Sequence, residues 1–195
     1  MKKLLITGFD PFGGEQINPS WESVKLLEDK IGEYSLIKLQ IPTIFKKGVD
    51  KIIERANEIN PDVIICVGQA GGRRGITPEV VAINLVEANI PDNEGNQPMG
   101  VPVINGGENA YFSTLPIRQM VTAIKTKEIP SALSFSAGAF VCNEVLYTLL
   151  NYFNGTNVKV GFIHVPFLPE QAGDKYPSME LNKIVEGLTI AIEQL

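Results

Sequence analysis

The sequence predicts a single α/β domain over residues 1–195, a three-layer α/β/α sandwich around a mostly parallel central sheet. Short runs rich in Val, Ile and Leu alternate with longer segments whose apolar residues recur at helical spacing, and this alternation is typical of a sheet with helices on both faces. One run, "DVIICV" at 62–67, is almost wholly apolar, as expected of a strand buried on both faces. A chain of 195 residues with 44% hydrophobic residues can bury one sizeable core.

The first half of the chain begins with a short strand and a Gly/Pro-rich loop. Asn18 and Pro19 then have the composition of a helix N-cap and first helical position. The patterns that follow predict, in order, a helix at 21–31, a strand at 34–41, a helix at 45–60 and strands at 62–68 and 79–90.

The second half continues the alternation after a turn-rich stretch, 91–108. That stretch is long for a structureless connection, so we expect a functional loop or a short hairpin there. The remaining patterns predict a helix at 115–129, a strand at 131–136, a helix at 142–153, a strand at 158–165 and a helix at 178–195.

Charge and composition exclude several classes of function. The net charge is −5 and the pI is near 5.0, which does not suit a nucleic-acid partner. No apolar run is long enough to cross a bilayer, and the first apolar run meets Asp10 and Pro11 too early for a signal peptide. The two cysteines give no disulfide framework, so we expect a cytoplasmic protein with reduced thiols.

Ligands in such folds collect at loops that follow the carboxyl ends of the strands. Two of these loops, "GFDPFGG" and "GQAGGRRG", are rich in glycine, but neither has a dinucleotide or P-loop fingerprint. Arg73 and Arg74 leave open an anion site. The ordinary interpretation is that the glycines permit tight turns.

Cys142 follows "SAGAFV" at the predicted start of a helix, where the helix dipole and free N–H groups favour a thiolate. The alternative is a buried thiol at a strand–helix junction, since free cysteines are usually buried. Cys66 lies in the middle of an apolar strand and is expected in the core.

His164 is the only histidine, so a Cys–His enzyme could use no other imidazole as its base, and a zinc site is not expected. Strand alternation places it on the opposite face from Ile163 and Val165. A lone histidine in a strand is more often a core residue with satisfied hydrogen bonds than a catalyst. Glu79 opens an apolar run, where it could orient an imidazole or serve as an edge-strand charge that blocks aggregation.

Five blocks of this sequence resemble the pyroglutamyl peptidase family, in the same order and spacing: "GFDPFGGEQINPSWE", "ICVGQAGGRRGITPEVVAIN", "IPDNEGNQP", "SAGAFVCN" and "GFIHVPFLPEQ". The resemblance extends from residue 4 to about 180. It implies a cytosolic cysteine peptidase that removes N-terminal pyroglutamyl residues from peptides. It also implies one α/β/α domain, no metal or cofactor, and commonly a homotetramer.

The same resemblance implies roles for particular residues. Cys142 corresponds to the nucleophile, His164 to the base and Glu79 to the third catalytic group. The ring pocket of the family corresponds to Phe9, Phe12, the backbone near Gln69, Phe140 and Val141.

Two positions depart from the family pattern. Asn89 stands before "IPDN", where the family commonly has an arginine thought to help the developing oxyanion. Glu144 follows "VCN", where many relatives carry histidine. Two other functions remain open from the residues: a phosphorylase-like protein that uses Arg73 and Arg74 for phosphate, and a binding protein without catalysis.

Overall fold

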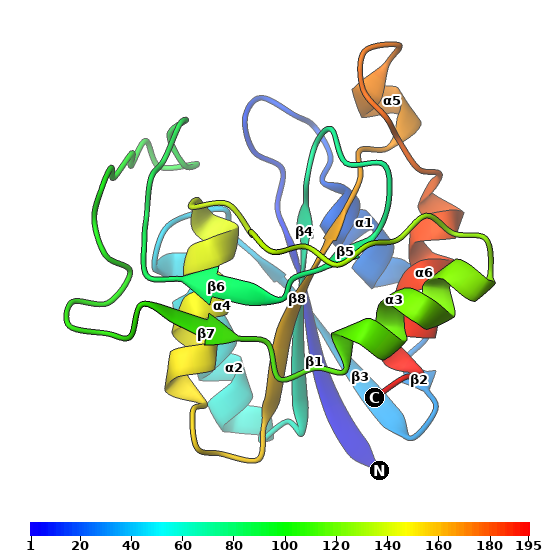
Figure 1. Cartoon of the computed structure of the whole chain (residues 1–195), viewed down its shortest axis with the longest axis horizontal. Helices are drawn as coiled ribbons and strands as arrows, with labels where there is room; N and C mark the ends of the chain where they lie inside the picture. Colours follow the sequence, from blue (N-terminus) through cyan, green and yellow to red (C-terminus); the bar gives the residue numbers. More distant parts are fainter.

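The central element of the computed structural model, which describes residues 1–195, is a six-stranded twisted sheet (Figure 1). Strands β1, β3, β4 and β8 are parallel, whereas the short edge strands β2 and β5 run antiparallel to their neighbours. The spatial order is β2 (Lys30–Ile31), β3 (Tyr34–Ile41), β1 (Lys2–Phe9), β4 (Val63–Gln69), β8 (Lys159–Val165) and β5 (Thr77–Pro78).

Helices cover both faces of this sheet. The helices of one face are α1 (Pro19–Leu26), α3 (Ile117–Thr126) and α6 (Leu181–Ile192), and those of the other are α2 (Lys47–Ile59) and α4 (Val141–Tyr152). The short α5 (Pro169–Ala172) follows β8. The predicted α/β/α sandwich with a mostly parallel sheet is therefore confirmed.

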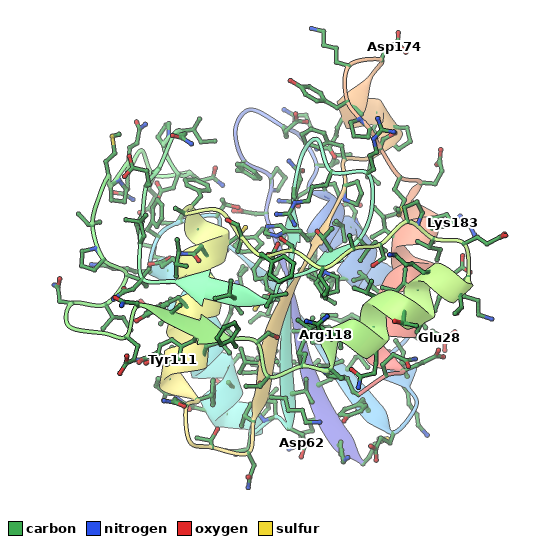
Figure 2. The ribbon with its side chains drawn as sticks, viewed as in Figure 1. Glu28, Asp62, Tyr111, Arg118, Asp174 and Lys183 are labelled. Carbon is green, nitrogen blue, oxygen red and sulfur yellow. The ribbon has the colours of Figure 1, made fainter.

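Strand alternation divides the core into two clusters. Ile64 and Cys66 of β4 face α2 and α4, whereas Ile65 and Val67 face α1, α3 and α6. Cys66 is completely buried, so the prediction of a core cysteine is confirmed. Charged side chains such as those of Glu28, Asp62, Asp174 and Lys183 lie at the periphery (Figure 2). None of the helices combines the length and apolar character needed to cross a membrane.

A small second sheet lies beside α4. It consists of β6 (Val81–Ile83) and β7 (Ala110–Phe112), which pair antiparallel. The strand predicted at 79–90 is therefore mostly wrong, because regular pairing ends at Ile83. No hairpin forms within residues 91–108; one isolated antiparallel bridge joins Val101 to Val86, which precedes that stretch.

Two further predictions were wrong. Residues 131–136 form no strand. They make only two isolated β-bridges to the segment around β5, at Ile76 and Glu79. Pro78 lies between those bridges and has no N–H to donate, which interrupts a regular ladder. The helix predicted at 21–31 ends at Leu26, and the remaining residues turn into β2.

Candidate functional site

The carboxyl end of β4 lies beside the start of α4, and this junction places the Cys142 thiol next to the strand position that pairs with His164. Gly68 of β4 lies opposite His164 in the parallel register. A β-carbon at Gly68 would lie 3.1 Å from the Cys142 Sγ atom. The Phe162 ring and the Cys142 thiol therefore border the space that a side chain at position 68 would need, and the thiol lies next to the strand that carries His164.

Cys142 is the second residue of α4, as the sequence predicted. Phe140, the N-cap residue, supplies no side-chain hydrogen bond to the first turn. The first N–H groups of a helix lack partners within the helix, so these donors remain available to an oxygen atom beside the thiol.

The helix start was expected to favour a thiolate, but burial and a neighbouring negative charge oppose that effect in the free protein. Burial raises the pKa of the Cys142 thiol to about 12, and the negative charge of Glu79 contributes in the same direction. These effects exceed the opposing influence of Arg73 and of the backbone N–H. The thiol is therefore protonated at neutral pH.

His164 is held in place by a buried carboxylate. Its Nδ1 atom lies 2.6 Å from Oε1 of Glu79, and its ring is almost completely buried. A carboxylate at this distance holds the proton on Nδ1, which leaves the Nε2 lone pair free to accept another. Burial lowers the pKa of His164 despite the hydrogen bond to Glu79, so the imidazole is neutral at neutral pH.

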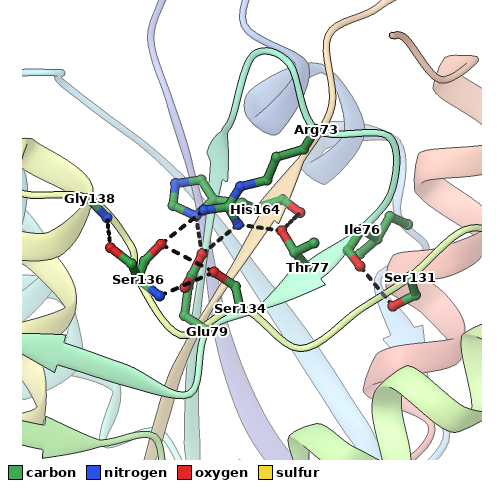
Figure 3. A network of polar contacts seen from close by, with 9 residues as sticks. All are labelled: Arg73, Ile76, Thr77, Glu79, Ser131, Ser134, Ser136, Gly138 and His164. Atoms are coloured by element: carbon green, nitrogen blue, oxygen red, sulfur yellow. Dashed lines mark hydrogen bonds and ion pairs between the residues drawn. The ribbon is translucent and has the colours of Figure 1, made fainter.

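Glu79 is completely buried and thus is not a solvent-facing edge charge. Burial alone would raise the pKa of its carboxyl group, but the hydrogen bond and charge of His164, together with Arg73, hold it below the ordinary value. Arg73 Nη1 donates to the same Oε1 atom at 2.7 Å and to Thr77 Oγ1. Its Nη2 atom donates to the Ser136 carbonyl at 3.0 Å, which joins the carboxylate to the loop before α4 (Figure 3).

An aromatic cluster adjoins the thiol. The rings of Phe12 and Phe140 are 6.3 Å apart between centroids, and Phe45 packs edge-on against Phe140 at 5.2 Å. Phe45 was not identified from the sequence, where it appeared only as the first residue of a helical pattern. Phe9 is 2% exposed and packs on Phe162, so it supports this region from the core. Val141 is buried in the same core.

Gln69 ends β4 and anchors the segment after β8. Its Oε1 atom accepts a hydrogen bond from Gln171 Nε2 at 3.1 Å, and the same Nε2 donates to the Ile17 carbonyl. The side-chain carbonyl of Gln69 is therefore held by the segment after β8.

Three further side chains were considered as contacts for an anion or an oxyanion, and they lie in different surroundings. Arg74 and Asn89 are exposed and make no side-chain hydrogen bond. Arg73 is committed to Glu79, so the paired-arginine phosphate site loses one of its two cations.

Comparison with known proteins gives a consistent result. The family model for pyroglutamyl peptidase matches residues 2–195. A pyrrolidone-carboxylate peptidase of Clostridium perfringens is 52% identical over 197 residues, which cover 99% of this chain and 92% of the relative. The crystal structure of pyroglutamyl peptidase I from Bacillus amyloliquefaciens matches with a TM-score of 0.96 at 50% identity, covering 100% of this chain and 96% of that one. Pyrrolidone carboxyl peptidase from Thermococcus litoralis matches with a TM-score of 0.94 at 35% identity, covering 99% and 92%.

Proposed function

We propose that this chain, which belongs to the pyroglutamyl peptidase family, is a cysteine peptidase that removes an N-terminal pyroglutamyl residue from peptides. The observation that supports the proposal is the buried Glu79–His164 pair, which lies on the strand next to the position against which the Cys142 thiol packs. Glu79 contacts His164 directly at 2.6 Å, and Cys142 lies over the strand position paired with that histidine. A nucleophile, a base and a group that orients the base are the components of acyl transfer.

The proposed reaction proceeds through a thioester. His164 Nε2 takes the proton from Cys142 as Sγ attacks the pyroglutamyl carbonyl, and the C=O electrons move to the oxygen. Backbone N–H groups at the start of α4 donate to that oxyanion. His164 then gives its proton to the departing amine as the C–N bond breaks. Water, deprotonated by His164, hydrolyses the thioester and releases pyroglutamate and free thiol.

The aromatic cluster suits the proposed substrate. A pyroglutamyl residue is a small, flat lactam without a charged α-amino group, so its site needs apolar surface and few polar groups. Phe12 and Phe140 offer ring faces of that kind, and backbone groups near Gln69 and Val141 can pair with the lactam N–H and C=O. A proline residue lacks the ring carbonyl and would leave a buried donor unpaired, which disfavours it strongly.

We further propose a homotetramer in a reducing compartment, the cytoplasm. Large apolar side chains are exposed at Met99, Phe112 and Phe135, which is consistent with subunit contacts. Cys66 and Cys142 are both free thiols, which suits a compartment that keeps thiols reduced. Light scattering of the active protein tests the assembly, and a monomeric mass would contradict it.

The function is tested by the release of a reporter amine from a pyroglutamyl amide, with the corresponding prolyl amide as control. We expect the first substrate to be cleaved and the second to be spared. Cys142→Ser should fold normally and lose activity by several orders of magnitude, whereas Cys66→Ser serves as the matched cysteine control and should keep most of it. Equal activity of Cys142→Ser and wild type would contradict the assignment of the nucleophile.

The same experiment separates the other two functions that the sequence left open. A phosphorylase-like enzyme would not cleave the amide and would be indifferent to alkylation of Cys142. A binding protein without catalysis would bind pyroglutamate but release no amine.

A further inference from the structure

Glu144 is a buried carboxylate whose role lies outside the reaction described above. It is 5% exposed and lies on α4, two residues after Cys142. Both of its oxygens accept the backbone N–H of Lys46, at 2.9 and 3.1 Å. Burial of an acidic side chain is unfavourable unless it is compensated. Here the only hydrogen-bond partner of the buried carboxylate is the Lys46 N–H, so we take the position of that N–H to be important.

The neighbouring amide is held in the same way by a second acid. Asp92 Oδ2 accepts the N–H of Phe45 at 3.0 Å, and its Oδ1 accepts the N–H groups of Glu94 and Asn96. Asp92 is 6% exposed. Two consecutive amides are thus fixed by carboxylates that come from different parts of the chain.

The segment held by these acids is strained and carries an aromatic ring. Lys46 has φ 64° and ψ −49°, an unfavourable conformation for a residue with a β-carbon. It precedes α2 and has no side-chain cap. The ring of Phe45, directly before it, packs edge-on against Phe140. Without a fixed Lys46 amide, this turn would relax and the ring would lose its defined position.

We propose that Glu144, with Asp92, is a positioning residue that fixes the Phe45–Lys46 turn and so makes Phe45 a wall of the substrate pocket. This inference rests on the proposed function, because the pocket is that of the pyroglutamyl ring. Glu144 acts on substrate binding through Phe45, and it takes no part in proton transfer at Cys142.

The charge state of Glu144 adds a measurable property. Burial raises the pKa of Glu144 to about 7, while the Lys46 N–H opposes the shift and the charges of Asp50 and Asp92 reinforce it. The charged groups that influence it are therefore Lys46 and Asp50 at the start of α2, and Asp92 in the connection between β6 and β7. Protonation below about pH 7 weakens a charge-assisted hydrogen bond to Lys46, and KM should rise there.

The test compares KM and kcat for a pyroglutamyl amide in Glu144→Ala, Phe45→Ala and the double variant. We expect KM to rise about tenfold in Glu144→Ala, the effect of losing one charge-assisted hydrogen bond, with kcat within about threefold of wild type. Phe45→Ala should give a similar or larger rise in KM. The double variant should resemble Phe45→Ala alone, because Glu144 acts through that ring.

Two further variants give the controls. Glu144→Gln is neutral like the protonated acid but keeps a carbonyl oxygen for Lys46. Its KM should therefore equal that of wild type below pH 7, lie below that of Glu144→Ala, and no longer change as pH rises through 7. Glu94 lies in the same loop as Asp92, and its carboxylate pairs with the Lys47 side chain at the surface. Glu94→Gln removes that charge and should leave KM unchanged.

Hydrogen exchange provides a measurement that does not depend on activity. The Lys46 amide should exchange faster in Glu144→Ala than in wild type and remain protected in Glu94→Gln. Additive effects on KM in the double variant, or unchanged exchange at Lys46, would overturn the positioning role. Failure of the wild type to cleave the amide would instead contradict the proposed function, and exchange at Lys46 would still decide the positioning role.

Discussion

Replacement of Gly68 by alanine should damage the site and the core together. A β-carbon at this position would lie 2.7 Å from two atoms of the Phe162 ring and 3.1 Å from Cys142 Sγ. The ring would have to retreat by about 0.7 Å to reach an ordinary contact distance, and it is completely buried. Overpacking of this kind destabilises by about 1–3 kcal/mol. A misplacement of about 1 Å at reacting groups lowers the rate about 100-fold.

The ring carries this displacement to the base, because the centroids of Phe162 and His164 are only 4.7 Å apart. We therefore expect kcat/KM for a pyroglutamyl amide to fall about 100-fold in Gly68→Ala. Thermal unfolding should show a lower Tm, by about 2–4 °C for each kcal/mol lost in a chain of this size.

Gly161→Ala is the matched control. Gly161 also lies in a central strand, and its added β-carbon would meet Leu115 at 2.3 Å, away from the thiol. We expect a comparable loss of stability with kcat/KM within about threefold of wild type at a temperature where the variant is folded. If Gly68→Ala kept wild-type kcat/KM, or if Gly161→Ala lost as much activity as Gly68→Ala, the reasoning from thiol placement would be refuted.

Three other perturbations test the electrostatics of the site. Arg73→Ala should lower kcat/KM and move the acidic limb of its pH profile to higher pH, because the guanidinium lowers the pKa of His164. The limb of Arg73→Lys should lie between those of wild type and Arg73→Ala. An unmoved limb in Arg73→Ala would contradict the influence of Arg73 on His164. Glu144→Gln should gain stability relative to wild type as pH rises. The folded-state pKa of about 7 exceeds the ordinary 4.5, so the protonated acid favours folding below 4.5 and this contribution is lost as pH rises through 7. The difference amounts to about 3 kcal/mol in urea unfolding, and a difference independent of pH would exclude the raised pKa. Asn89→Arg should raise kcat with little change in KM, because a cation near the oxyanion acts mainly in the transition state. An unchanged kcat, together with a loss of kcat in Arg74→Ala, would show that another cation already fills this role.

The sheet and its helices could be predicted because each carries a strong local pattern. The strand predicted at 34–41 has the same bounds as β3, and the apolar run at 62–68 nearly coincides with β4. The strand prediction for 131–136 was wrong because the composition of this segment carries no information about the segment beside which it lies. Pairing there depends on the chain beside it, where Pro78 removes a donor.

The candidate catalytic residues were found by motif and by rarity, since the chain has one histidine. Phe45 and the function of Asp92 and Glu144 were not found, because nothing local marks them. Glu144 was noted only as a departure from a family pattern. Its hydrogen bond to Lys46 joins residues 98 apart in the sequence, and no periodicity or spacing predicts such a contact.

The carboxylates that organise the site have a consequence for how the protein folds. Glu79 meets His164 across 85 residues and Glu144 meets Lys46 across 98, so neither pair can form before distant parts of the chain have docked. Contacts of such high contact order require closure of long loops and form slowly. Enzymatic activity should therefore return only at the end of refolding, after the helical signal has recovered, which makes catalysis a reporter of complete assembly of the sheet.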